Sequence, residues 1–122
     1  MILVDTSVWS DHLRAGDAAL ATMLNDREVL MHPFVLGEMA CGNLRNRTMV
    51  LRLLEGLPQS AVATDAEVLF FIDQRELMGR GMGYIDAHLM ASVSLSRPAK
   101  LWTRDKRLRA VARSLALDSD KE

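Results

Sequence analysis

The sequence predicts an α/β domain with three layers, in which helices cover both faces of a central parallel sheet. Short apolar runs alternate along the chain with longer stretches in which apolar residues recur at helical spacing. This alternation is typical of β-α-β units, and such units build parallel sheets. The first run, residues 1–4, is wholly apolar and stops at Asp5. A run of this kind suits a strand buried on both faces, as at the centre of a parallel sheet.

The remaining elements follow from the same periodicities. We expect four strands, at residues 1–4, 29–31, 61–63 and 100–103, the third being the weakest candidate. We expect helices at residues 8–13, 18–25, 33–42, 49–54, 65–79, 86–97 and 108–117. Pro33 suits a first helical turn, and Thr64 with Glu67 matches a capping box at the start of the fifth helix.

Length and composition indicate one soluble domain. The chain has 122 residues, about a quarter of them charged, and we assign residues 1–117 to a single domain and 118–122 to a polar, solvated tail. The net charge of −1 gives no overall attraction to nucleic acid, so any such attraction must be local. The single cysteine, Cys41, is expected to be buried and unpaired. No apolar run or leader suggests a membrane or export, which favours the cytoplasm.

Four acidic residues occupy positions where packing gives no reason for a charge. Asp5 and Asp105 each follow a predicted strand, Glu38 interrupts an apolar helix, and Asp86 opens a helix after a glycine-rich turn. The carboxyl ends of parallel strands lie at one edge of a sheet, where ligands bind in open α/β folds. Asp5 and Asp105 should therefore be neighbours there. The residue pattern alone does not fix Asp86 at that edge. Asp5 also suits a turn or cap and Asp86 a helix cap, and Asp105 could be a loop acid paired with Arg104 or Lys106.

Clustered carboxylates point to a metal site. Two of them about 4 Å apart, at an effective dielectric of about 20, repel by about 4 kcal/mol, and cations relieve this repulsion. Oxygen ligands favour Mg²⁺ or Mn²⁺, and such ions support in-line phosphoryl displacement. Three hydroxyl residues beside the acids, Thr6, Ser7 and Thr103, are expected to orient them by hydrogen bonds.

At this point the residues resemble a known family, the PIN domain, and most closely its VapC toxins. The resemblance rests on four segments in the family's order, namely Leu3-Val4-Asp5-Thr6-Ser7, Glu38, Gly81-Met82-Gly83-Tyr84-Ile85-Asp86-Ala87-His88-Leu89, and Leu101-Trp102-Thr103-Arg104-Asp105-Lys106-Arg107-Leu108. It spans nearly the whole chain. The last two blocks together are specific, although each alone is weak.

The resemblance implies more than the pattern does. The family's acidic constellation falls on Asp5, Glu38, Asp86 and Asp105, without substitution. Members are Mg²⁺- or Mn²⁺-dependent endoribonucleases that cut structured RNA, such as tRNA or rRNA, leaving 5′-phosphate and 3′-hydroxyl ends. They commonly form homodimers and are inhibited by a VapB-type antitoxin, whose C-terminal segment enters the active-site groove. DNA is reached only indirectly, through the antitoxin.

Basic residues gather next to the acids in sequence. We expect contact with RNA phosphates from one group after the last strand and from a second group after Glu38: Arg104, Lys106 and Arg107, and Arg45 and Arg47. Arginine outnumbers lysine in the chain, and its planar fork suits bidentate phosphate binding. Histidines are expected to play no catalytic part, because Mg²⁺-type sites prefer oxygen; His88 should point away from Asp86.

Rival functions are disfavoured by the residues beside Asp5. A phospho-accepting receiver domain would need an acidic pair after the first strand, and a haloacid-dehalogenase phosphatase would need Asp-x-Asp. Here Asp5 is followed by Thr6 and Ser7. A binding module that keeps the fold but lacks catalysis remains the main alternative, although four intact acids argue against it.

Overall fold

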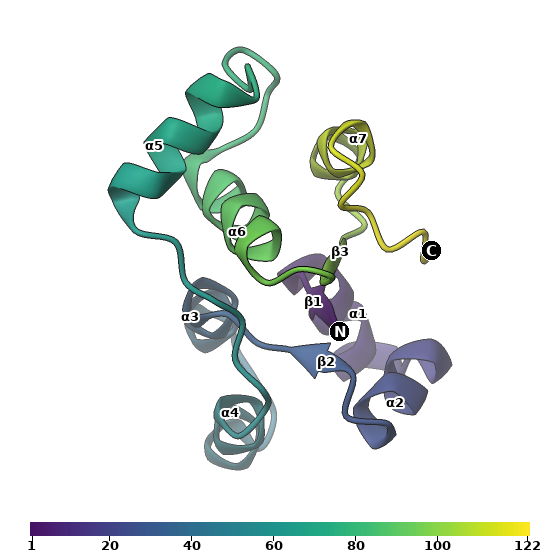
Figure 1. Cartoon of the computed structure of the whole chain (residues 1–122). Helices are drawn as coiled ribbons and strands as arrows, with labels where there is room; N and C mark the ends of the chain where they lie inside the picture. The colour runs from purple at the N-terminus through teal and green to yellow at the C-terminus, as the bar shows by residue number, and fades with distance from the viewer.

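The computed structural model describes residues 1–122 and has a small parallel sheet at its centre (Figure 1). The strands are β1 (Ile2–Val4), β2 (Val29–Leu30) and β3 (Lys100–Trp102), in the order β2-β1-β3. Leu3 of β1 is in register with Leu30 on one side and Leu101 on the other. The first apolar run is therefore the central strand, as its sequence predicts.

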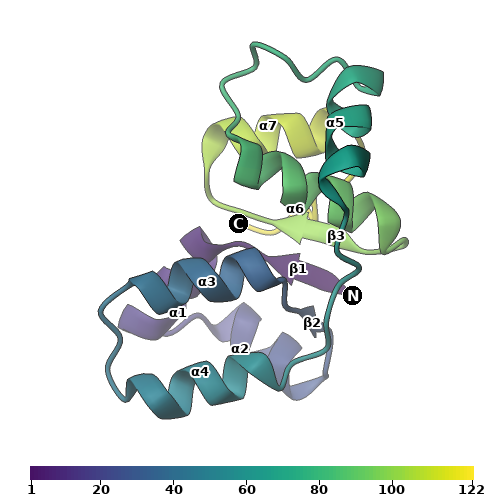
Figure 2. The same cartoon turned by 90° about the vertical axis from the view of Figure 1, so that its left-hand side faces the viewer.

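Helices cover both faces of this sheet. They are α1 (Thr6–Ala15), α2 (Ala18–Asn25), α3 (Pro33–Cys41), α4 (Arg47–Glu55), α5 (Asp65–Gln74), α6 (Tyr84–Leu95) and α7 (Lys106–Ser114). Figure 2 shows α5, α6 and α7 on one side of the strands and α1 to α4 on the other. The three-layer parallel α/β class is thus confirmed. None of the helices is both long and apolar enough to cross a membrane.

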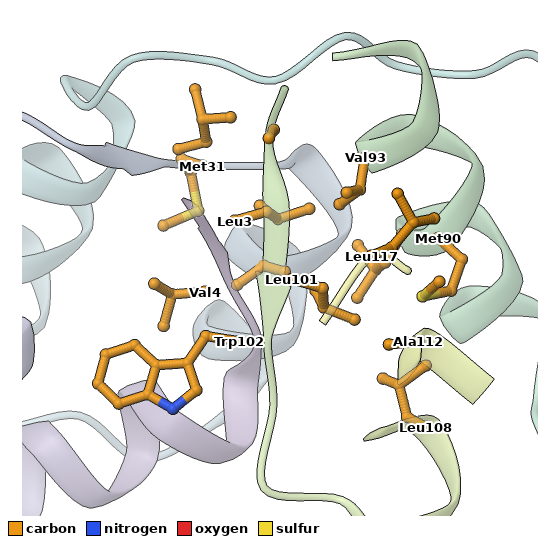
Figure 3. Close-up of a cluster of buried hydrophobic side chains, with 14 of the residues drawn as sticks. Leu3, Val4, Met31, Met90, Val93, Leu101, Trp102, Leu108, Ala112 and Leu117 are labelled. Carbon is orange, nitrogen blue, oxygen red and sulfur yellow. The ribbon is translucent and has the colours of Figure 1, made fainter. Parts of the chain in front are cut away.

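The core forms where the central strands meet the helices. Leu3, Val4 and Leu101 have no exposed surface. The close-up shows Leu3 of β1, Leu101 of β3, and Met90 and Val93 of α6 within one cluster of buried side chains (Figure 3). Two adjacent strands buried on both faces give the sheet its stability, because buried apolar area is the main favourable term in folding.

The predicted strand at residues 61–63 is wrong. The chain pairs with the edge of β2 only briefly, through Met31 N–H to Pro58 O and Ser60 N–H to Met31 O. Beyond that point the backbone turns to α6, and the N–H groups of Ala61 and Ala63 donate to the hydroxyls of Ser96 and Ser92. Side chains of a helix, rather than another strand, satisfy this backbone.

Several boundaries and burial predictions also need correction. The fifth helix ends at Gln74 rather than near Gly79, and α7 starts two residues earlier and ends earlier than the predicted 108–117. Cys41 is exposed rather than buried. The tail is not simply solvated, because Asp118 is buried and Leu101 exchanges backbone hydrogen bonds with Leu117 and Ser119.

Candidate active site

Asp5 is the most firmly held acid of the site. It lies directly after β1, its side chain is buried, and its backbone N–H donates to Trp102 O at 2.9 Å. Its Oδ2 accepts hydrogen bonds from Thr103 Oγ1 at 2.7 Å and from Ser7 Oγ at 2.9 Å. Two of the three expected orienting residues, Ser7 and Thr103, therefore contact this carboxylate. Its Oδ1 accepts no hydrogen bond from the chain and remains available to a ligand.

Glu38 reaches the site from α3. Its Oε1 accepts a hydrogen bond from Thr6 Oγ1 at 3.0 Å, so Thr6 orients Glu38 rather than Asp5. Glu38 is exposed, whereas its apolar sequence neighbours suggested burial. The buried face of α3 is formed by Val35 and Met39, one turn apart. Glu38 thus lies on the solvent side, where a carboxylate can meet substrate without a large desolvation cost.

Asp86 lies in the first turn of α6, three residues after Gly83. Gly83 is the N-cap residue, so Asp86 is not the cap. The chain passes from α6 into β3, which is parallel to β1, so the helix N-terminus faces the carboxyl edge of the sheet. Burial raises the pKa of Asp86, and the charges of Asp5, Asp105 and Glu38 raise it further. Asp5, Asp105 and Glu38 therefore each lie within electrostatic reach of Asp86.

Asp105 has two roles at the start of α7. It is the N-cap residue, and its Oδ1 accepts from Leu108 N–H at 3.0 Å. Its own backbone N–H donates to Thr103 Oγ1, the hydroxyl that holds Asp5. Asp105 is therefore a helix cap rather than a loop acid paired with Arg104 or Lys106, and its second carboxylate oxygen accepts no hydrogen bond from the chain. A cap and a metal ligand are compatible in one side chain.

The carboxylate oxygens at this edge suit a hard divalent ion that keeps several of its water ligands. No three His, Cys, Asp or Glu side chains form a ready ligand set for a metal. Mg²⁺ is commonly held by one or two carboxylates with several waters, and it needs no closed protein cage. Burial and then the charges of Asp5, Asp105 and Glu38 raise the pKa of Asp86, and a bound cation would offset both effects. Asp5, Asp86 and Asp105, with Glu38 nearby, would hold such an ion.

A cleft of about 680 Å³ opens beside Glu38, whereas Asp5, Asp86 and Asp105 do not line it. It is bounded by α1, α3 and residues 42–50, and its lining includes Thr6 and Glu38 at the acidic end and Arg14 and Arg45 elsewhere. Arg14 was not among the predicted site residues. Its spacing from Thr6 and Ser10 puts the three on one face of α1, a signal that could have identified it.

The predicted basic residues divide into two groups. Lys106, Arg107 and Arg45 are exposed. Arg47 is also exposed, but its guanidinium donates to the carbonyls of Ala40 and Gly42 at the end of α3. Arg104 forms ion pairs with Asp11 and Asp17, two partly exposed aspartates, so the expectation of a free phosphate-binding guanidinium does not match its surroundings.

His88 and His32 make their side-chain contacts with residues other than the four acids. His88 Nε2 meets Asp65 Oδ1 at 2.9 Å, and the same oxygen accepts from Tyr84 hydroxyl. His32 is fully buried, and its Nε2 lies 3.0 Å from Ser92 Oγ. Both histidines therefore connect elements of the fold.

Carboxylates thus gather at the carboxyl edge of a parallel sheet, where hydroxyls orient Asp5 and Glu38, and Glu38 borders a cleft. The PIN domain profile matches residues 2–114. The chain belongs to the PIN domain family.

Curated relatives carry this assignment further. The chain is similar to ribonuclease VapC32 from two strains of Mycobacterium tuberculosis, with 54% identity over 110 residues, covering 90% of this chain and 89% of the relative. Two solved structures share the fold. The structure of FitAB bound to an IR36 DNA fragment has a TM-score of 0.61 at 20% identity, covering 93% of this chain and 91% of that chain. FitAcB from Neisseria gonorrhoeae has a TM-score of 0.63 at 19% identity, covering 93% and 94%.

Proposed function

We propose that this protein is a Mg²⁺- or Mn²⁺-dependent endoribonuclease and the toxin of a VapBC-type toxin–antitoxin pair. The observation that carries the proposal is the electrostatic convergence of Asp5, Glu38 and Asp105 on Asp86 at the carboxyl edge of the sheet. The similarity to ribonuclease VapC32 over nine-tenths of the chain supports the choice of RNA over other phosphodiesters. Membership of the PIN family makes the receiver and phosphatase hypotheses unnecessary.

The chain's own residues would divide the work as follows. Asp5, Asp86 and Asp105 hold the divalent ion, with Ser7 and Thr103 fixing the Asp5 carboxylate. When bound, this ion supplies positive charge that acidifies water and stabilises the leaving oxygen. Glu38 lies beside this position and orients or deprotonates the attacking water.

The bond that breaks follows from in-line attack of water on phosphorus. The P–O3′ bond is cleaved, so the 3′ oxygen leaves and takes up a proton, and the phosphate stays on the 5′ side of the next nucleotide. Structured RNA, such as tRNA or rRNA, is the expected substrate. Lys106, Arg107 and Arg45 are the exposed basic residues that we assign to phosphate contact.

We propose two protein partners. A VapB-type antitoxin would inhibit the enzyme by placing a C-terminal segment in the cleft beside Thr6 and Glu38. This complex, rather than the toxin alone, would contact DNA. A second copy of the chain would cover exposed apolar side chains on α5 and α6, including Leu69, Phe70 and Leu95. Sedimentation of the purified chain would show a dimer. Separately, we expect the protein to act in the cytoplasm.

The decisive experiment compares the wild-type chain with Asp5→Asn and with Asp26→Asn, an exposed acid at the end of α2 that serves as the matched control. Each is mixed with folded RNA and Mg²⁺ or Mn²⁺, with and without chelator, and the product ends are mapped. We expect Asp5→Asn to lose at least about a hundredfold in rate and the control to lose nothing. Full cleavage by Asp5→Asn would contradict the assignment. RNA binding without cleavage by the wild-type chain would instead support a silent binding module.

A further inference from the structure

Arg104 lies between two residues of the candidate site, and its backbone belongs to the hydrogen bonds that hold it. Its N–H donates to Ser7 Oγ at 3.0 Å, and Ser7 in turn donates to Asp5 Oδ2. Thr103 donates to the same Asp5 oxygen and accepts from the N–H of Asp105. The position of residues 103–105 therefore determines how two of the proposed metal ligands are oriented.

The side chain of Arg104 leaves the site and connects two helices. Its Nη1 donates to Asp11 of α1 at 2.8 Å, and its Nη2 donates to Asp17. Asp17 is the N-cap of α2, where it also accepts from Leu20 N–H at 3.0 Å. The guanidinium lies 5.5 Å from the centre of the Trp102 ring, and only 26% of the side chain is exposed. One side chain thus joins α1, the start of α2 and the end of β3.

These surroundings make Arg104 a poor ligand for RNA phosphate. Two carboxylates outweigh one guanidinium, so the local charge repels an anion. The pairing is mutual: Asp11 and then Asp17 raise the pKa of Arg104. The Leu20 N–H and then Arg104 lower the pKa of Asp17. Lys106, two residues further along, is exposed and makes no ion pair, so it is the better phosphate ligand.

We propose that Arg104 is a positioning residue: by binding Asp11 and Asp17 it fixes residues 103–105, so that Thr103 and Ser7 hold Asp5 in a metal-binding orientation and Asp105 faces the same pocket. This inference rests on the proposed metal-dependent nuclease function. Its consequence is that loss of the ion pairs weakens divalent-ion binding before it affects affinity for RNA.

The test uses Arg104→Gln and Asp17→Asn, singly and together. Asparagine keeps the N-cap hydrogen bond of α2 but removes the charge that holds Arg104. Mn²⁺ binding is measured without RNA by electron paramagnetic resonance, and RNA KM and the Mg²⁺ dependence of cleavage are measured separately. We expect Arg104→Gln to weaken Mn²⁺ binding by about tenfold, the size of effect seen when groups that orient metal ligands are removed. Asp17→Asn should weaken it by a smaller factor, and the double variant no more than Arg104→Gln alone.

Two further variants separate the alternatives. Arg104→Lys keeps the charge but loses the planar fork, so it should recover only part of the Mn²⁺ affinity. Lys106→Gln should leave Mn²⁺ affinity unchanged and raise the KM for RNA. If Arg104→Gln behaved like Lys106→Gln, with a raised KM and unchanged Mn²⁺ affinity, Arg104 would be an RNA ligand and our proposal would be wrong.

The remaining outcomes also support or contradict the proposed role of Arg104. If Arg104→Gln does not fold, Asp17→Asn supports the proposal by weakening Mn²⁺ binding and contradicts it by leaving that binding unchanged. A wild-type chain that binds Mn²⁺ but cleaves no RNA would overturn the proposed function, while the Mn²⁺ measurements would still test Arg104. A wild-type chain that binds no Mn²⁺ would overturn both.

Discussion

At the scale of single residues, the charged form of Asp86 lowers the stability of the folded chain. Asp86 is pushed toward its neutral form by burial and by three neighbouring acids, so its pKa is raised. Between its unfolded and folded pKa values the folded chain binds more protons, so this group's contribution to stability declines as pH rises through that window. At neutral pH, without metal, the charged Asp86 therefore destabilises the fold. A divalent ion would reverse that effect by pairing with the charge.

Asp86→Asn should consequently stabilise the metal-free protein while removing activity. We expect its free energy of unfolding at about pH 7 to rise by about 0.5–2 kcal/mol, the range common for stabilising substitutions. Urea unfolding in chelator measures this change, and the RNA cleavage assay measures the loss of rate. The gain should shrink as pH falls, because the wild-type carboxyl becomes protonated. A variant less stable than wild type in chelator would show that Asp86 has a structural partner that outweighs the repulsion.

His32 gives the stability of the fold a pH dependence opposite to that from Asp86. Its Nδ1 accepts from Phe34 N–H and caps α3, and burial, with a smaller effect from the charge of His88, lowers its pKa to about 4. Below the unfolded value, about pH 6.5, the unfolded chain takes up a proton that folded His32 does not. Stability is therefore fully present above that value and is lost as pH falls toward 4. From about pH 7 to about pH 5 this one group should remove about 2 kcal/mol.

His32→Asn tests this assignment, because the Asn side-chain oxygen preserves an acceptor for Phe34 N–H. The variant will be less stable overall, since it loses the contact with Ser92, which lies 3.0 Å from His32. Its stability should nevertheless change less than that of wild type between the two pH values, as measured by urea unfolding at each. An equal change in both proteins would assign the acid sensitivity to another group.

At the scale of elements, patterns that involve neighbouring residues were predictable. The buried run before Asp5, the capping box of Thr64 and Glu67, and the position of Pro33 all appear as expected. Each depends on residues within a few positions of one another. The acids at strand ends followed from parallel topology, which sends successive strands to the same edge.

Features that depend on distant contacts were not predictable. The backbone of residues 61–63 pairs with Ser92 and Ser96, about thirty positions away. Apolar residues surround Glu38 in sequence, so the sequence does not show which face of α3 is exposed. Packing of α3 against α1 and α4 determines that face. The partners of Arg104 lie 87 and 93 positions away. No local pattern indicates such pairs.

The C-terminal segment is the clearest case of an element missed by local patterns. Leu117 and Ser119 extend the sheet beside Leu101, and buried Asp118 pairs with Arg109 and Arg113 of α7. Asp118→Asn should therefore destabilise the fold by about 1–3 kcal/mol, since the arginines lose a charged acceptor. Asp73→Asn, an exposed acid on α5, serves as control and should change stability by less than about 0.5 kcal/mol. Thermal unfolding of both variants measures the difference in stability. Equal stability of the two variants would mean that backbone hydrogen bonds alone hold the C-terminal segment.

At the scale of the whole molecule, the proposed RNA binding requires a local concentration of positive charge, because the net charge gives no attraction. The chain carries a net charge of −1, and the acidic site itself repels phosphate. Attraction must come from exposed basic residues at the same edge of the sheet, where Lys106 and Arg107 open α7. Arg27 and Arg97 are equally exposed but precede β2 and β3, so they lie toward the opposite edge. The two pairs form a matched comparison.

RNA binding is measured in an Asp5→Asn background, so that no cleavage occurs. Replacing Lys106 and Arg107 by Gln should weaken binding about tenfold and reduce the slope of log K against log salt by about 1.4, because each phosphate contact on a single strand contributes about 0.7. Replacing Arg27 and Arg97 by Gln changes the net charge by the same amount. It should leave both quantities nearly unchanged if RNA binds at the carboxyl edge. Equal losses in the two double variants would mean that RNA senses only the overall charge, and would remove Lys106 and Arg107 from the proposed binding surface.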